Sequence, residues 1–130
     1  MYEWREHTAE LELVVEAPSD EEVFATALDA FGRLIERDDR GEPATEYVEL
    51  EAPDRAGLLI AWLEELIFLA DTRSFVPDHA TSLTLEDHLL TATLEGRVAA
   101  LDPLVKAATY HGLRFTHDGG VWRATVVLDV

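Results

Sequence analysis

The stretch SDEEVFATALDAFGRLIER, residues 19–37, carries the clearest structural signal in the sequence. It opens with Ser19 and Glu22 in the S-x-x-E spacing of a capping box, in which each side chain accepts a hydrogen bond from a backbone N–H group at the start of a helix. The apolar residues behind it recur at the intervals of three and four that mark one buried helix face. They are Val23, Phe24, Ala27, Leu28, Phe31, Leu34 and Ile35. The pattern predicts an amphipathic helix that ends near Arg37.

A second amphipathic helix is predicted after Pro53-Asp54. Its apolar positions cover a broad face and are Leu58, Leu59, Trp62, Leu63, Leu66, Ile67 and Leu69. Glu64 and Glu65 fall on the opposite, narrower side of the helix, which we expect to face solvent.

Short alternating segments around these helices are typical of half-buried strands. They lie at residues 2–5, 11–15, 47–51, 83–85, 89–94, 113–115 and 121–128. Asp118-Gly119-Gly120 marks a hairpin turn before the last of them, since glycine adopts positive φ without strain. A polar loop is expected at 38–43, and a connection at 98–105 that Pro103 interrupts. The order of elements predicts an α+β fold, in which a mainly antiparallel sheet is covered by the two helices.

Length and composition indicate one domain that spans residues 1–130. The sequence has no apolar run of the roughly 20 residues that cross a bilayer, and its charged start, MYEWREHTAE, lacks the apolar centre of a signal peptide. We therefore expect a cytoplasmic protein with no membrane partner. The absence of cysteine excludes disulfides, thiolate metal sites and cysteine nucleophiles.

The charge balance is strongly acidic, with 27 acidic against 10 basic residues and a formal net charge of -17. Such a charge repels nucleic-acid phosphates, so we expect no stand-alone binding of RNA. Nine of the basic residues are arginines, and Lys106 is the one lysine. An acid-rich, lysine-poor composition fits a halophilic source, and it fits equally a GC-rich genome that favours arginine codons.

Three short segments stand out, because phosphate-binding loops, H-E-x-x-H zinc motifs and serine nucleophile elbows are absent from the sequence. They are EHTAE at 6–10, VKAATYH at 105–111 and VLDV at 127–130. As an ordered set over the whole chain they resemble the archease family, as do the two helical stretches and the final strand with Trp122. The resemblance implies a small metal-binding protein that activates an RtcB-type RNA ligase. Such a ligase joins RNA ends in tRNA splicing and RNA repair, and archease promotes its guanylylation and multiple turnover.

The resemblance also implies a metal site. Its ligands in that family are the acidic residue of the HTA motif, the penultimate aspartate and the C-terminal residue, which fall here on Glu10, Asp129 and Val130. Val130 has no side-chain donor, so it would bind through main-chain oxygen. Oxygen donors suit a hard divalent cation, which favours calcium, with magnesium or manganese as alternatives. Glu10 stands where the family usually has aspartate, and its extra methylene moves the carboxylate by about one bond length.

Lys106 is assigned by the resemblance to the activation of the ligase, with no independent catalysis by this chain. An ammonium group is a compact charge that can approach a phosphate or a carboxylate closely. The residues also allow two other functions. One is a metal-dependent phosphoester hydrolase that uses the same carboxylates, and the other is a chaperone-like interaction module. Structural or packing roles are expected for the remaining polar residues of the motifs, which are His7, Thr8, Thr109, Tyr110 and His111.

Overall fold

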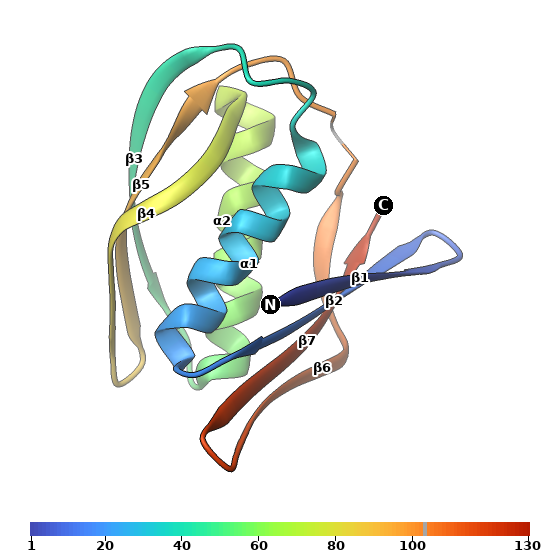
Figure 1. The fold of residues 1–130 in the computed structure, drawn as a ribbon, viewed down its shortest axis with the longest axis vertical. Coiled ribbons are helices and arrows are strands. Elements are labelled where there is room, and N and C mark those ends of the chain that lie inside the picture. The colour runs from blue at the N-terminus through green and yellow to red at the C-terminus, as the bar shows by residue number, and fades with distance from the viewer. Residues whose placement is uncertain (103) are drawn as a thin grey trace.

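The chain folds into three layers, with two helices between two antiparallel sheets (Figure 1). The computed structural model describes residues 1–102 and 104–130. The strands are β1 (Tyr2–His7), β2 (Glu10–Ala17), β3 (Glu42–Glu51), β4 (Phe75–Glu86), β5 (Leu89–Val98), β6 (Ala107–Asp118) and β7 (Val121–Asp129), and the helices are α1 (Asp20–Ile35) and α2 (Arg55–Arg73). Both helices contact strands of both sheets, so each sheet buries one face against them.

The strands divide into a four-stranded sheet of order β1-β2-β7-β6 and a three-stranded sheet of order β3-β5-β4. Every pairing is antiparallel, and the predicted α+β class with two covering helices is confirmed. The single expected sheet is in fact two, because alternation marks a strand without identifying its partner. Strand β7 lies inside the four-stranded sheet, between β2 and β6, although it is the last strand in the sequence.

Helix α1 begins as the capping box predicts, because the Ser19 hydroxyl accepts a hydrogen bond from the N–H of Glu22 at 3.2 Å. Its apolar face is buried, with Phe24 and Phe31 among the largest fully enclosed side chains. The helix ends at Ile35, two residues before the predicted end at Arg37, since Glu36 adopts extended dihedral angles.

Helix α2 is capped by Asp54, whose carboxylate accepts a hydrogen bond from the N–H of Gly57 at 2.7 Å. The expectation that Glu64 faces solvent is wrong. The Glu64 side chain is half-buried and accepts a hydrogen bond from the backbone N–H of Ala108 at 2.9 Å, which fixes the start of β6 against the helix. No helix among the described residues is long and apolar enough to span a membrane.

The strands are longer than predicted, and three of them begin at least five residues early. Strands β3 and β6 begin at Glu42 and Ala107 instead of residues 47 and 113, and β4 begins at Phe75 instead of residue 83. The early part of β4 contains Pro77 and two register shifts, and a proline removes a ladder donor and hides the strand pattern. The described residues between β5 and β6, 99–102 and 104–106, form a connection as predicted, with one isolated bridge at Leu101, whereas Val98 still belongs to β5. The predicted interruption at Pro103 lies outside the described residues.

Helix α1 approaches β4 closely, because two glycines flank the same segment. A Cβ atom on Gly32 of α1 would overlap the carbonyl oxygen of Pro77, and a Cβ on Gly96 of β5 would overlap that of Val76. The backbone of β4 is thereby held between a helix and a neighbouring strand with no side chain at either contact. This approach seals the core beside Phe75, which is 1% exposed.

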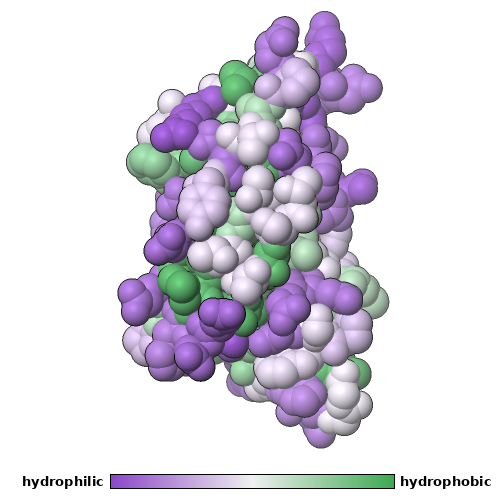
Figure 2. All heavy atoms as spheres, turned by 90° about the vertical axis from the view of Figure 1, so that its left-hand side faces the viewer, coloured by the Kyte–Doolittle hydropathy of each residue, from purple (hydrophilic) through white to green (hydrophobic). Residues whose placement is uncertain are grey.

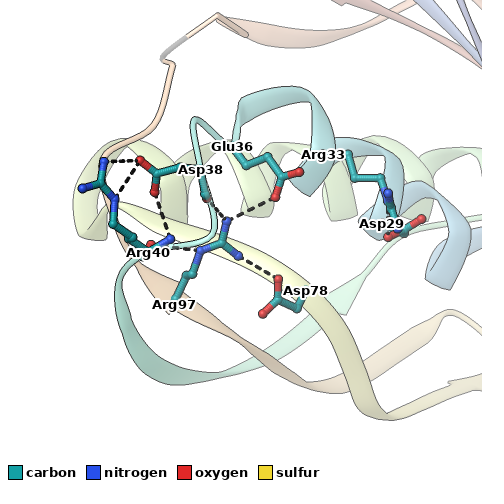
Figure 3. Close-up of polar contacts among 7 residues, drawn as sticks. All are labelled: Asp29, Arg33, Glu36, Asp38, Arg40, Asp78 and Arg97. Atoms are coloured by element: carbon teal, nitrogen blue, oxygen red, sulfur yellow. Dashed lines mark hydrogen bonds and ion pairs between the residues drawn. The ribbon is translucent and has the colours of Figure 1, made fainter.

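Arg97 of β5 links β4 to the end of α1 and to the loop that follows it (Figure 3). Its guanidinium donates to Asp78 at 2.9 Å and Glu36 at 3.1 Å, and to the backbone carbonyls of Asp38 and Arg40. The Arg97 side chain is only 11% exposed, whereas its partners are more open to solvent. Nearby, the side chain and then the backbone N–H of Arg40 lower the pKa of the Asp38 carboxyl by hydrogen bonding.

The outer face of the three-stranded sheet is uncovered. Figure 2 shows residues of near-neutral hydropathy along the middle of this face, bordered by hydrophilic ones. The register aligns Tyr47 with Thr93 and Ser82, and Thr91 with Thr84 across the three strands. Tyr47 is 66% exposed.

Replacing Gly32 by alanine is predicted to destabilise the fold by about 1–3 kcal/mol, because the new methyl group must displace the Pro77 carbonyl. Helix propensity alone would give the opposite sign. Ala25→Gly on the exposed side of the same helix measures that propensity and should cost about 1 kcal/mol. Urea unfolding measures the free energy of unfolding of both variants. A Gly32→Ala protein more stable than the parent would contradict the packing argument.

Arg97→Met is predicted to lower the free energy of unfolding by about 2–4 kcal/mol, since it leaves several polar groups without their partner. The control is Arg33→Met, which removes an exposed ion pair with Asp29 and should change the stability very little. Thermal and urea unfolding of both variants provide the measurement. Equal losses in the two would show that Arg97 is no more than a surface charge.

Candidate functional site

Strand pairing places Glu10 directly opposite Asp129. The two are Cα partners at the end of the β2–β7 ladder. Residues paired in this way point to the same face of a sheet, with Cβ atoms about 4.5–5.5 Å apart. Glu10 is half-buried and Asp129 is exposed. The structure thus brings together two acidic side chains that are far apart in the sequence.

Val130 is held beside this pair by its backbone. Its N–H donates a hydrogen bond to the carbonyl of Ala9 at 3.2 Å, and its side chain packs against the core. Ala9 forms the turn between β1 and β2 with a positive φ of 57°. In Figure 1 the C-terminus accordingly lies near the β1–β2 hairpin. A residue bonded in this way is more ordered than a frayed terminus.

The donor set suits a cation. Within residues 1–102 and 104–130, neither Glu10 nor Asp129 forms an ion pair with a basic side chain. Two neighbouring carboxylates without a counter-charge repel each other, and hard cations are bound by such oxygen donors. Over the same residues no three side chains of His, Cys, Asp or Glu gather in a metal-binding arrangement. A main-chain oxygen can serve as a third protein ligand, and Val130 offers one beside the pair.

Lys106 is attached to the same point of the sheet. Its backbone N–H donates to the carbonyl of Asp129 at 2.8 Å, and the next residue, Ala107, is the strand partner of Asp129. The Lys106 side chain is exposed and forms no ion pair with any described residue. The VKAATYH segment and the final VLDV segment are therefore adjacent in space.

The rest of the VKAATYH segment forms a bulge. Thr109 pairs with Val127 but Arg114 pairs with Thr125, so four residues of β6 lie opposite one of β7. Gly112, with a φ of 68°, allows this path. Thr109 has a buried hydroxyl with no hydrogen-bond partner in the described structure. Its burial agrees with the packing role expected from the sequence.

Three expected structural roles in these motifs find little support in the geometry. Tyr110 is 71% exposed, and His111 next to it is also exposed. A bulge turns their side chains outward, and alternation along the strand cannot reveal a bulge. His7 has a single weak contact, with its Nε2 atom 4.0 Å from Glu12. The sequence motifs do not include Glu64, whose carboxylate accepts the hydrogen bond from the Ala108 N–H and so positions the segment that carries Lys106.

Known proteins match this chain over its whole length. A sequence profile of the Archease protein family matches residues 2–130. Protein archease of Methanosarcina barkeri is 31% identical, over 99% of this chain and 95% of its own, and that of Pyrobaculum neutrophilum is 29% identical with the same coverage.

Solved structures agree with this match. The solution structure of protein 1598 of Methanobacterium thermoautotrophicum has a TM-score of 0.76 and 27% identity, and covers 99% of this chain and 98% of that one. The crystal structure of an archease and possible chaperone from Thermotoga maritima, at 22% identity, shares the fold with a TM-score of 0.68 and covers 100% of this chain and 98% of its own. The profile match and the relatives together place the chain in the Archease protein family.

Proposed function

We propose that this protein activates an RtcB-type RNA ligase by promoting its guanylylation, and that it is not itself an enzyme. Family membership supports the proposal. The observation that carries it is the 2.8 Å hydrogen bond from the Lys106 N–H to the Asp129 carbonyl, which joins the one lysine to the candidate metal ligands. A cationic side chain and a carboxylate cluster at one point are suited to a site where phosphate groups are transferred.

Glu10, Asp129 and the carboxylate that Val130 carries at the end of this sequence would hold a divalent cation, with calcium favoured over magnesium and manganese. A bound cation supplies positive charge that offsets the charge of phosphate oxygens. The chain's own contribution is to keep the carboxylates together despite their repulsion. The β2–β7 ladder fixes Glu10 against Asp129, and the bond to Ala9 fixes Val130.

The partner is proposed to be the ligase protein rather than RNA. A net charge of -17 opposes the approach of a polyanion, so the RNA would be held by the ligase, in the cytoplasm. Lys106, whose side chain is exposed and whose backbone N–H is bonded to Asp129, would reach the nucleotide of the ligase only in the complex of the two proteins.

Glu10→Gln is predicted to weaken calcium binding about tenfold or more, since it removes one of three charged oxygen donors. Adding a short peptide after Val130 should have a similar effect, because it converts the terminal carboxylate to a neutral carbonyl. Isothermal titration with calcium and manganese measures both. The matched control is Glu12→Gln, two residues along the same face of β2, which should bind as the parent does. Unchanged affinity in the extended protein would eliminate the terminal carboxylate as a ligand.

Lys106→Ala is predicted to slow guanylylation of the ligase at saturating activator by about tenfold or more, because a charge that meets the transferring phosphate acts mainly in the transition state. The exposed side chain adds little to the fold, so the melting temperature should hardly change. Lys106→Arg keeps the charge but widens the group, and it is expected to restore only part of the rate. Single-turnover guanylylation with each variant is the measurement.

Three outcomes would overturn this assignment. Full activation by both Lys106 variants would make the lysine a bystander. Hydrolysis of phosphodiester substrates by the protein without the ligase would favour the hydrolase alternative, and prevention of ligase aggregation without any change in guanylylation would favour a chaperone-like module.

A further inference from the structure

An open cleft of about 480 Å³ lies next to the proposed metal site. Its walls come from the β1–β2 hairpin, the last turn of α1, the segment before β6 and the last residue. Its lining comprises Trp4, Glu6, His7, Glu10, Leu11, Leu34, Leu104 and Val130. The proposed metal site shares Glu10 and Val130 with the cleft and does not involve Trp4, Leu34 or Leu104.

The walls of the cleft are apolar. Trp4 pairs with Leu13 across β1 and β2, and Leu13 is fully buried, so Trp4 lies on the helix-facing side of the sheet. Leu34, in the last turn of α1, is half-buried, and Leu104 is 41% exposed. A ligand that covers this exposed apolar surface gains about 25 cal/mol of favourable free energy for each Å² buried.

The polar lining of the cleft consists of two carboxylates, Glu6 and Glu10, and one imidazole, His7. Glu6 pairs with Leu11, which places it on the same side of β1 as Trp4, toward the cleft. Glu6 is exposed, and neither it nor Glu10 has an ion-pair partner among the described residues. Carboxylates that border an apolar cavity attract a ligand with both an apolar part and a positive charge.

We propose that this cleft binds a protein segment in which a leucine-like side chain adjoins an arginine or a lysine. The volume is in the range of about 300–1,000 Å³ that is typical of ligand pockets, and it exceeds a single side chain. The apolar side chain would pack on Trp4 and Leu34, while the cationic group meets Glu6. The inference rests on the proposed function only for the source of the segment, which would be the protein that this chain activates. Trp4, Glu6 and Leu34 are not among the proposed metal ligands.

The indole N–H signals of the three tryptophans in an NMR spectrum report separately on the cleft and on the rest of the protein. Trp4 lines the cleft, Trp62 is buried with its indole N–H bonded to the Phe24 carbonyl, and Trp122 stacks on His117 at 4.2 Å. The experiment titrates N-acetyl-leucyl-arginine amide into the ¹⁵N-labelled protein with a chelator present, so that no metal takes part. We expect a saturable shift of the Trp4 indole signal, with the other two unmoved.

Controls test the two halves of the ligand. N-acetyl-leucyl-glutamine amide and N-acetyl-glycyl-arginine amide should each bind about fivefold or more weakly, because each lacks one contact. Glu6→Gln should weaken the response to the first probe by a similar factor, whereas Glu51→Gln on the distant strand β3 should not. Absence of a Trp4 shift at millimolar probe, or equal shifts with all three probes, would overturn the proposal. A Trp4 shift in a protein that fails to activate the ligase would reject the proposed function and leave the cleft as assigned.

Discussion

The pairing of β2 with β7 is the contact on which both the fold and the candidate site depend. It joins Glu10–Ala17 to Trp122–Asp129 along the whole of β2, and it closes the four-stranded sheet from strands at opposite ends of the chain. Contacts so distant in sequence carry a large entropic cost of loop closure. The buried residues Leu13, Val126 and Leu128 offset that cost on the helix-facing side. The same ladder ends at the pair of Glu10 and Asp129.

Local patterns predicted the helices well, because capping and periodicity act within one turn. Ser19 and Asp54 cap as their side-chain chemistry requires. The pairing of the strands could not be predicted in the same way, since alternation gives the direction of a side chain and does not identify the neighbouring strand. The first part of β4 was missed because Pro77 breaks the pattern, although Gly32 and Gly96 explain in the structure why the chain passes there. The division into two sheets likewise depends on which distant strands pair, and no local pattern shows that.

At the candidate site, too, residues in short motifs could be predicted, whereas a contact between distant segments could not. Glu10, Asp129 and Lys106 were selected from motifs. The strand register pairs the first two, and a backbone hydrogen bond links Lys106 to Asp129. Their roles in binding and activation rest on chemistry and family likeness. Glu64 could not be found in this way, because a glutamate between leucines on a helix is ordinarily a solvated residue. Its hydrogen bond to Ala108 exists only once α2 and β6 meet.

The position of β7 also has a consequence for biosynthesis. This strand lies between β2 and β6, yet a ribosome makes it after both. At about 5–20 residues per second, β2 waits about 5–20 s for its partner, with one row of backbone donors and acceptors unpaired. Exposed strand edges invite aggregation unless charges guard them. Glu10, Glu12 and Glu16 alternate along β2, so the acidic residues of this strand can keep nascent chains apart until the sheet is complete.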